Sequence, residues 1–335
     1  MTKRTAQTVC VIGSNSFSGG DFVDLLLGET DYDIVGVSRS PENSSTFLAY
    51  RGRPDLSRFR FHRLDLNRDM PALLDLLSQT KPAYVVNFAS QSEVAPSWDH
   101  PEQWFQTNAV STAALANFLR RQRWLKRYVH ISTPEVYGSC EGAVREDAPF
   151  NPSTPYAASR AAAELLLSTL VKEYGFPLTV IRSTNVYGAH QQLYKIIPRT
   201  VIYLKIGRRL PLHGGGQQVR SFIHIRDVSR GELAAMEAGG SGQAYNLSPG
   251  HGVTIRELVE DVCDALSVDF AAATEEASAR PGNDNIYVID STKARAELQW
   301  APRVSLDEGL AQVIAWIERE WSEIRSLGLE YVHRP

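Results

Sequence analysis

The sequence predicts an α/β protein with a doubly wound parallel sheet, a Rossmann fold, and a smaller mixed α/β C-terminal lobe that binds substrate. Up to about Asn185, short β-rich segments alternate with Ala- and Leu-rich helical segments, which is typical of a parallel sheet covered by helices. A Gly-rich turn also follows the first of these β-rich segments. After Asn185 the alternation fades into Gly-, His- and Gln-rich loops.

Six β-rich segments are expected to form the sheet, at 8–12, 33–37, 59–64, 84–87, 127–132 and 178–183. Two later segments, 222–225 and 244–247, also have strand composition, so we expect the chain to return to the sheet. This predicts a dinucleotide-binding domain at 1–186 and 219–250. The substrate-binding lobe then comprises 187–218 and 251–335, with a helix at 255–266 and a loop in the Ala-rich stretch near Ala271.

Composition narrows the function classes. The 335 residues carry a formal net charge of -3, which argues against a general nucleic-acid binder. The cysteines Cys10, Cys140 and Cys263 have no metal-ligand or redox spacing, so neither a metal site nor disulfides are expected. The sequence shows no cleavable signal and no apolar run of the roughly 18 residues that span a bilayer. We therefore expect a cytoplasmic protein without membrane partners.

The turn after the first strand is the candidate dinucleotide site. Gly13-Ser-Asn-Ser-Phe-Ser-Gly19 opens a helix, and such a turn lets backbone amides approach a pyrophosphate. The usual third glycine is replaced by Ser16, which permits the close approach if its φ is negative. The residues expected to contact the cofactor here are Gly13, Asn15, Ser16, Phe17, Ser18 and Gly19.

The ends of the next strands supply further cofactor candidates. The second strand ends in Ser38-Arg39-Ser40, without the carboxylate that NAD enzymes use to hold the ribose. These residues can instead hold a 2′-phosphate, which favours NADP over NAD; the alternative is a solvent-exposed loop arginine. Further cofactor candidates follow the third and fourth strands. Asp65 and Leu66 are expected to frame the adenine, and Phe88, Ala89 and Ser90 are expected to lie under the ribose.

Tyr156-Ala-Ala-Ser-Arg160 is a redox motif with arginine in place of lysine. Residues four apart share one face of a helix, and Thr154, Pro155 and Gly175 suit its two ends. A nearby cation lowers the pKa of a phenol, as a general base requires. Arg160 keeps the charge but cannot lose it, and it is bulkier than lysine. The alternative is a purely structural pair.

Together with these features, further motifs resemble the extended short-chain dehydrogenase/reductase family, especially its nucleotide-sugar 4,6-dehydratases. The resemblance covers nearly the whole chain. Besides the Gly-rich turn it rests on the motifs that begin at Ile131 (Ile-Ser-Thr-Pro-Glu-Val-Tyr-Gly), Glu146, Asn151, Asn185, Arg220 and Arg280. It implies that Tyr156 removes the proton of the sugar C4 hydroxyl while hydride passes to the nicotinamide, with Thr133 and Ser132 as a hydroxyl relay. Glu135 then removes the C5 proton, the C6 hydroxyl leaves, and hydride returns to C6.

Two positions depart from the family pattern. Thymidine-sugar dehydratases place an Asp before the catalytic Glu, whereas this chain has Pro134, which cannot donate a proton. Guanosine-sugar dehydratases resemble this chain but have Ser there, so Glu135 itself can return its proton to the leaving water. Arg160 is the second departure, and it is expected to contact the nicotinamide ribose and to retain catalysis at a lower rate.

The resemblance also implies a substrate site. Gln91, Ser92 and Glu93 match the sugar pocket, and Asn185 and Lys195 match positions that touch the pyrophosphate and sugar. The other expected substrate contacts, two arginines for the diphosphate and two residues for the nucleotide, are Arg220, Arg280, His213 and Gln218. The sequence does not specify the nucleotide base of the substrate, although GDP-linked sugars are weakly favoured. We expect a homodimer through the Ala- and Leu-rich helices at 102–121 and 156–174; the alternative is that both are buried within the monomer.

Three functional hypotheses result. The first is an NAD(P)-dependent nucleotide-sugar 4,6-dehydratase that forms a 4-keto-6-deoxy sugar. The second is a 4-epimerase or a uronic acid decarboxylase, and Glu135 separates it from the first because simple epimerases do not need an acid there. The third is a catalytically silent dinucleotide sensor, which Ser16, Pro134 and Arg160 favour.

Overall fold

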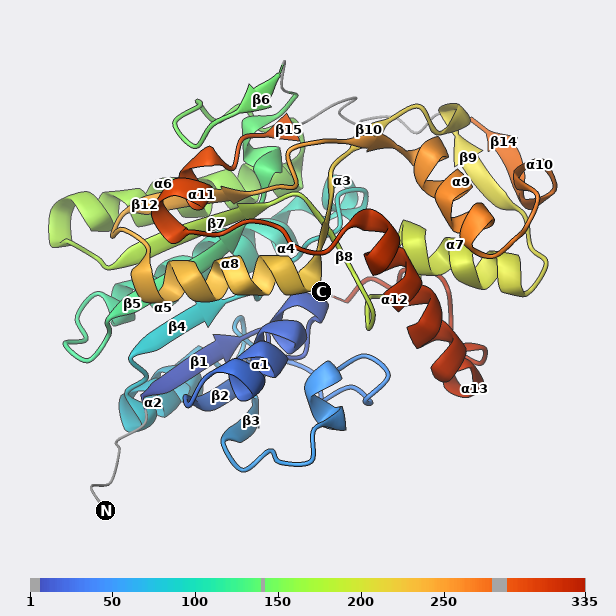
Figure 1. Ribbon diagram of the computed structural model, residues 1–335. Coiled ribbons are helices and arrows are strands. Elements are labelled where there is room, and N and C mark those ends of the chain that lie inside the picture. The colour runs from blue at the N-terminus through green and yellow to red at the C-terminus, as the bar shows by residue number, and fades with distance from the viewer. Residues whose placement is uncertain (1–6, 140–141, 279–287, 335) are drawn as a thin grey trace.

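A computed structural model shows the fold and describes residues 7–139, 142–278 and 288–334 (Figure 1). A parallel sheet of seven strands forms its centre, in the order β12-β7-β5-β4-β1-β2-β3. The strands are β1(Thr8–Ile12), β2(Asp33–Ser38), β3(Phe59–Arg63), β4(Tyr84–Asn87), β5(Arg127–Ser132), β7(Leu178–Ser183) and β12(Gln243–Leu247). The doubly wound parallel sheet is thereby confirmed. Successive strands are added in one direction from β1 to β2 and β3, and in the opposite direction from β4 to β5, β7 and β12. Folds of this kind bind ligands at the switch point, here between β1 and β4.

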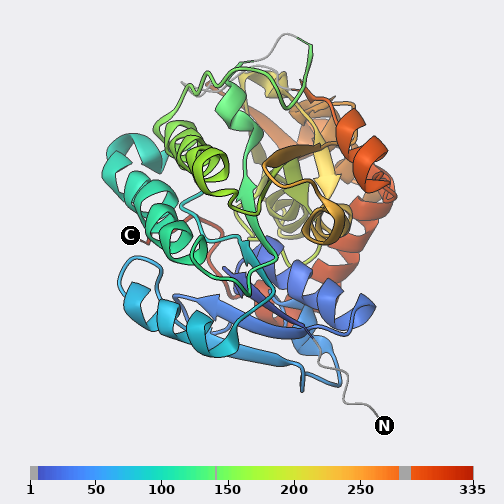
Figure 2. The same ribbon diagram turned by 90° about the vertical axis from the view of Figure 1, so that its left-hand side faces the viewer.

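Helices cover both faces of the sheet because alternate residues of β1 point to opposite sides. Val9 and Val11 belong to the core under α1(Phe17–Glu29) and α8(Ile225–Ala238). Cys10 and Ile12 belong to the core on the other face, which is covered by α2(Met70–Thr80), α5(Thr112–Leu119) and α6(Pro155–Tyr174). In Figure 2 these three helices lie on one side of the sheet and α1, in dark blue, lies on the other.

Helix α6 begins and ends where the sequence predicts. The Thr154 hydroxyl accepts a hydrogen bond from the Ala157 amide, and Pro155 follows as the first helical residue. Gly175 ends the helix with φ 63°, a left-handed conformation that glycine adopts easily. The helix expected at 102–121 is divided into α4(Pro101–Phe105), the π-helical segment η2(Gln106–Ser111) and α5, and the short α3(Pro96–Asp99) precedes it.

The lobe beside the carboxyl ends of the strands has its own core around Trp316, built by α7(Ile196–Lys205), α9(Ile255–Ala265) and α12(Leu306–Arg319). The loop expected near Ala271 is wrong: Asp269 caps a short helix, α10(Phe270–Ala273). The helix continues into β14(Thr274–Ala277), which pairs with β9(Leu210–His213).

The strand expected at 222–225 ends one residue earlier, as β11(Phe222–His224), because His224 caps α8. It pairs with β8(Asn185–Tyr187) rather than with the main sheet, whereas β12 joins the main sheet as expected. The remaining elements are η1(Ala49–Gly52), η3(Pro134–Tyr137), β6(Ala143–Val144), β10(Val219–Arg220), η4(Gly214–Gly216), β13(Val253–Thr254), β15(Val288–Ile289), α11(Thr292–Leu298) and α13(Trp321–Ile324).

Within the described ranges, no helix combines the length and apolar character needed to cross a membrane. Nor do His, Cys, Asp and Glu side chains gather there into a group that could hold a metal ion. Cys10 and Cys263 are both buried free thiols.

Candidate active site

The Gly-rich turn between β1 and α1 is packed too tightly for side chains at its two glycines. A Cβ on Gly19 would lie 2.3 Å from the Gly13 carbonyl oxygen, and one on Gly13 would lie 2.8 Å from the Ala89 amide nitrogen. Gly13 also has φ 89°. Ser16 has φ -83°, as its role in the turn requires, and its hydroxyl accepts a 3.1 Å hydrogen bond from the Gly19 amide. The serine thus caps the helix without obstructing the turn. Phe17 and Ser18 are half-buried in the first turn of α1.

Asn15 ties this turn to the end of β2. Its backbone amide donates to the Ser38 hydroxyl at 2.9 Å, and its side-chain amide donates to the Ser40 hydroxyl at 2.6 Å. Arg39 is exposed, and its guanidinium donates to the Arg334 carbonyl oxygen at 3.0 Å. All three residues expected to hold a 2′-phosphate therefore have other partners within the protein.

The cofactor candidates after β3 and β4 differ in what they can offer. Leu66 and Phe88 are buried in the two cores of the sheet, so they contribute packing. One carboxylate oxygen of Asp65 accepts the Asn67 amide at 2.8 Å. Ala89 and Ser90 are half-buried, and the Ala89 backbone lies directly against Gly13 of the Gly-rich turn.

Tyr156, Thr133 and Glu135 come together at the end of β5. Tyr156, at the start of α6, hydrogen-bonds the Thr133 side chain, and its ring is buried. Thr133 caps η3, where its hydroxyl accepts a 3.3 Å hydrogen bond from the Glu135 amide. Glu135 is half-buried and lies close enough to act electrostatically on Tyr156. The phenol, the hydroxyl and the carboxylate thus form one cluster.

The expectation of a lowered phenol pKa is wrong as a net effect. Burial and the neighbouring Glu135 raise the pKa of Tyr156 to about 12. Arg160 does lower the pKa of Tyr156, as predicted, but its effect is smaller than that of burial and of Glu135. At neutral pH the phenol in this structure is therefore protonated.

Arg160 is buried and turned toward β5. Its guanidinium donates to the Ile131 carbonyl oxygen, and its Nε has no hydrogen-bond partner among the described residues. Burial, then Arg160 and then Arg182, hold the pKa of His130 well below its usual value. Arg160 therefore adds positive charge to the interior under β5 as well as to Tyr156.

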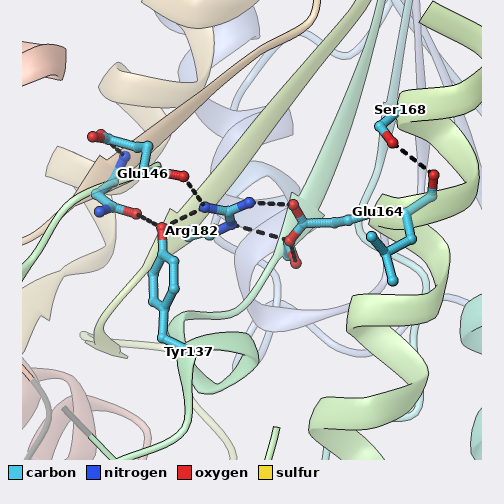
Figure 3. A network of polar contacts seen from close by, with 8 residues as sticks. Tyr137, Glu146, Glu164, Ser168 and Arg182 are labelled. Carbon is cyan, nitrogen blue, oxygen red and sulfur yellow. Dashed lines mark hydrogen bonds and ion pairs between the residues drawn. The ribbon is translucent and has the colours of Figure 1, made fainter. Parts of the chain in front are cut away.

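Ser132, expected as part of a hydroxyl relay, belongs to a different network. Figure 3 shows the Glu164, Arg182 and Tyr137 side chains of this network. Its hydroxyl donates to Glu164 Oε1 at 2.5 Å, and Glu164 forms a buried ion pair of 2.5 Å with Arg182 Nη2. Arg182 also donates to the Tyr137 hydroxyl, which donates to Asn246 Oδ1 at 3.0 Å. The network does not direct the Ser132 proton toward Tyr156. It holds both flanks of the turn that carries Thr133 and Glu135.

The sequence reasoning missed Glu164 and Arg182. The available signal was a pair of charged residues within otherwise apolar elements, Glu164 in the Ala- and Leu-rich helix α6 and Arg182 at the end of the apolar strand β7. Charged residues are almost never fully buried unless they are paired.

A pocket of about 430 Å³ lies between α7, β9 and the loop after β4, and Glu93, Lys195, His213 and Gln218, all predicted substrate contacts, line it. Lys195 Nζ forms an ion pair of 2.6 Å with Glu93 Oε1. Glu93 also raises the pKa of Tyr156, so this carboxylate connects the pocket electrostatically with the cluster of Tyr156, Thr133 and Glu135.

The other predicted substrate residues have separate positions. Gln91 is buried: its backbone exchanges hydrogen bonds with the Asn108 side chain, and its own amide donates to the Arg334 carbonyl oxygen at 2.8 Å. Ser92 is exposed. Asn185 begins β8 and Arg220 ends β10, both half-buried, and Arg280 lies outside the described residues.

Comparison with known proteins places this site in a family. The family model described as GDP-mannose 4,6 dehydratase matches residues 10–313. A dTDP-glucose 4,6-dehydratase of Streptomyces griseus is 35% identical over 324 residues, which cover 93% of this chain and 95% of that protein. A dTDP-glucose 4,6-dehydratase of Haemophilus influenzae is 28% identical over 92% of this chain and 97% of its own length.

Solved structures agree. The dTDP-glucose 4,6-dehydratase of Streptomyces venezuelae, solved with NAD bound, has a TM-score of 0.87 and 31% identity, over 94% of this chain and 98% of that one. UDP-glucuronic acid 4-epimerase of Bacillus cereus, with UDP-glucuronic acid and NAD, has a TM-score of 0.85 and 26% identity, over 93% and 99% of the two chains. Since the family model and the relatives both span nearly the whole chain, the protein belongs to the GDP-mannose 4,6 dehydratase family of nucleotide-sugar 4,6-dehydratases.

Proposed function

We propose that the protein removes water from a nucleoside-diphosphate hexose to form a 4-keto-6-deoxy sugar, with Tyr156, Thr133 and Glu135 as its catalytic residues. The observation that supports this most is the cluster of these three side chains at the end of β5. A carboxylate beside the Tyr-Thr pair is what an elimination step needs and what a simple epimerisation does not.

We assign NAD, rather than NADP, as the cofactor. The turn fits a dinucleotide, because glycines at positions 13 and 19 permit the close packing of β1 and α1 that directs backbone amides and the helix N-terminus toward a pyrophosphate. The dehydratase from S. venezuelae and the epimerase from B. cereus both hold NAD. The engagement of Ser38, Arg39 and Ser40 with other groups removes the sequence argument for a 2′-phosphate. When bound, NAD supplies the hydride acceptor, the returning hydride donor and a positive charge.

The residues of this chain move the protons. Thr133 and Tyr156 hold the C4 hydroxyl, whose proton passes to the phenolate of Tyr156 as C4 is oxidised. Because the phenol alone is protonated at neutral pH, its ionisation needs the positive charge that bound NAD would supply. Arg160 favours that ionisation. Glu135 removes the C5 proton and delivers it to the departing C6 hydroxyl, which leaves as water. C5 regains a proton from solvent, and Tyr156 releases to solvent the proton that it took from the C4 hydroxyl. Pro134 has no proton to give, so this assignment uses one carboxyl group for both transfers.

The substrate occupies the pocket beside α7 in this proposal. Lys195 and Arg220 carry positive charge for the diphosphate, Glu93 faces the sugar, and His213 and Gln218 line the nucleotide end. The relatives are named for dTDP-glucose and for UDP-glucose, and these substrates differ in their nucleotide base. The experiment therefore compares substrates with different bases.

The test is to incubate the purified protein and NAD with dTDP-, UDP- and GDP-linked hexoses and to analyse the products by mass spectrometry. The proposal predicts a product lighter by one water from at least one substrate, with no net change in NAD. An isomer of unchanged mass would identify an epimerase, and loss of carbon dioxide from a uronic acid would identify a decarboxylase. Glu135→Gln abolishes water loss if Glu135 is the base, but it would spare an epimerase.

A homodimer formed through α5 and α6 is also part of this proposal. Val110 in η2, which leads into α5, and Leu165 in α6 are each more than half exposed, at 55% and 57%, and large apolar side chains in such positions favour an interface. Light scattering should give twice the monomer mass, and Leu165→Glu should return it to the monomer value.

A further inference from the structure

The segment 327–334, here called the strap, crosses from the substrate lobe to the dinucleotide domain. In Figure 1 it is the red ribbon that runs back from α13 toward the middle of the molecule. One end is fixed by Leu329, which packs against the apolar cores of the lobe. The other end is fixed by His333 on the dinucleotide domain. The strap therefore bridges the two parts of the protein.

His333 is a well-defined anchor. Its ring stacks on His100 at 5.4 Å and 9°, and on the buried Trp104 at 5.2 Å and 16°. Its Nε2 lies 2.7 Å from Gln103 Oε1. Beyond it, the Arg334 carbonyl oxygen accepts hydrogen bonds from both Gln91 and Arg39, which come from the ends of two different strands.

Tyr331 lies between these two anchors and lines the 430 Å³ pocket together with Glu330. Its ring packs edge-on against Tyr194 at 5.4 Å, and its hydroxyl is 3.1 Å from His333 Nδ1. Tyr194 donates to Glu93 at 3.1 Å, the carboxylate that also pairs with Lys195. Burial and then Glu93 raise the pKa of Tyr331, which places the phenol close to that carboxylate.

We propose that Tyr331 is a further substrate contact, held by the strap against the bound nucleotide sugar where the sugar meets the diphosphate. The inference rests on the proposed function of the same pocket. A tyrosine ring gives a large rigid surface at little entropic cost, and its face can cover a sugar ring. Because both ends of the strap are anchored, the ring is preorganised for this contact.

The experiment measures the affinity of the protein for dTDP-, UDP- and GDP-linked hexoses by calorimetry, with NAD present, and the affinity for NAD separately. For the nucleotide sugar that the wild-type protein binds, Tyr331→Ala should weaken binding roughly tenfold. Tyr331→Phe should retain most of it, since the ring remains. His333→Ala, which removes the anchor, should weaken it in the same direction. Val332→Ala is the matched control, because Val332 lies between Tyr331 and His333 in the chain and its side chain is 72% exposed.

Unchanged sugar-nucleotide affinity in Tyr331→Ala would overturn the inference. So would a tighter NAD complex in His333→Ala, because the strap would then compete with the dinucleotide instead of forming one wall of the substrate pocket. If the wild-type protein bound no nucleotide sugar, the proposed function would fail together with the inference. If it bound and dehydrated one with Tyr331 irrelevant, only the inference would fail.

Discussion

The Ser132 hydroxyl donates a 2.5 Å hydrogen bond to Glu164 Oε1, and through it the end of β5 is fastened to helix α6. Glu164 is paired with Arg182, whose other contacts reach Tyr137 on the far side of the turn that carries Thr133 and Glu135. Thr133 and Glu135 thus lie between Ser132 and Tyr137, which are both hydrogen-bonded to the buried Glu164–Arg182 ion pair. This arrangement makes the position of the turn sensitive to residues that touch no substrate.

Ser132→Ala should lower kcat by about tenfold and change KM less than twofold, because the fastening is lost while the pocket stays intact. Steady-state kinetics on the substrate found by the product test measures both constants. Ser168→Ala is the control, since its hydroxyl on the same helix donates only to the local Leu165 carbonyl oxygen at 2.7 Å. Equal effects of the two changes, or a loss confined to KM, would argue against a positioning role.

Arg160→Met should move the pH midpoint of sugar oxidation upward. Arg160 lowers the pKa of Tyr156, so its loss raises that pKa and the ionised phenol forms only at higher pH. The transient absorbance of reduced nicotinamide, followed against pH with the Glu135→Gln background to stop the later step, reports this midpoint. Arg120→Met removes a guanidinium over the Tyr174 ring, away from the site, and should leave the profile unchanged. A midpoint that does not move would remove Arg160 from the tuning of Tyr156.

Gly19→Ala should weaken NAD binding at least tenfold, because the new Cβ would lie 2.3 Å from the Gly13 carbonyl oxygen and force the turn apart. Calorimetric titration with NAD measures the loss. Gly52→Ala is a matched control, since its Cβ would meet no atom within 4 Å. Unaltered NAD affinity in Gly19→Ala would place the dinucleotide elsewhere.

Glu232→Gln should stabilise the fold at pH 8. Glu232 is fully buried in α8, neither carboxyl oxygen has a hydrogen-bond partner among the described residues, and burial raises its pKa well above the usual value. The folded state therefore holds the proton more tightly than the unfolded state, and stability falls as pH rises from about 4.3 through the raised folded-state pKa. Glutamine avoids this loss, so the free energy of unfolding should rise by about 1–3 kcal/mol at pH 8 and by less at pH 5. Urea denaturation at both pH values is the measurement, and Glu318→Gln, on the exposed face of α12, should show no such difference.

Most of the sheet could be predicted from the sequence because its inner strands are largely apolar, whereas the edge strand β3 has the sequence Phe-Arg-Phe-His-Arg. The ranges expected for β1, β4, β5 and β7 match the structure residue for residue, and the caps of α6 do as well. The prediction failed at Ala271, where a single capping aspartate turns an Ala-rich stretch into a helix. Such a short helix depends on its neighbours more than on its composition.

The site was less accessible to sequence reasoning. Motifs identified Thr133, Glu135 and Tyr156, but no motif reports how deeply a phenol is buried, and burial reversed the expected direction of the Tyr156 pKa. The preference for NADP lacks support for a similar reason, since Ser38 and Ser40 accept hydrogen bonds from Asn15 in another loop. Contacts between distant segments decide both outcomes.

The two hydrogen bonds that the Arg334 carbonyl oxygen accepts join the end of β2 to the loop after β4. Arg39 donates from one of these segments and Gln91 from the other, so neither segment can shift without moving residue 334 or breaking one of the bonds. Tyr331, three residues earlier in the chain, lines the pocket beside α7. A local change at the end of β2 can therefore reach the substrate pocket through the backbone of residues 331–334.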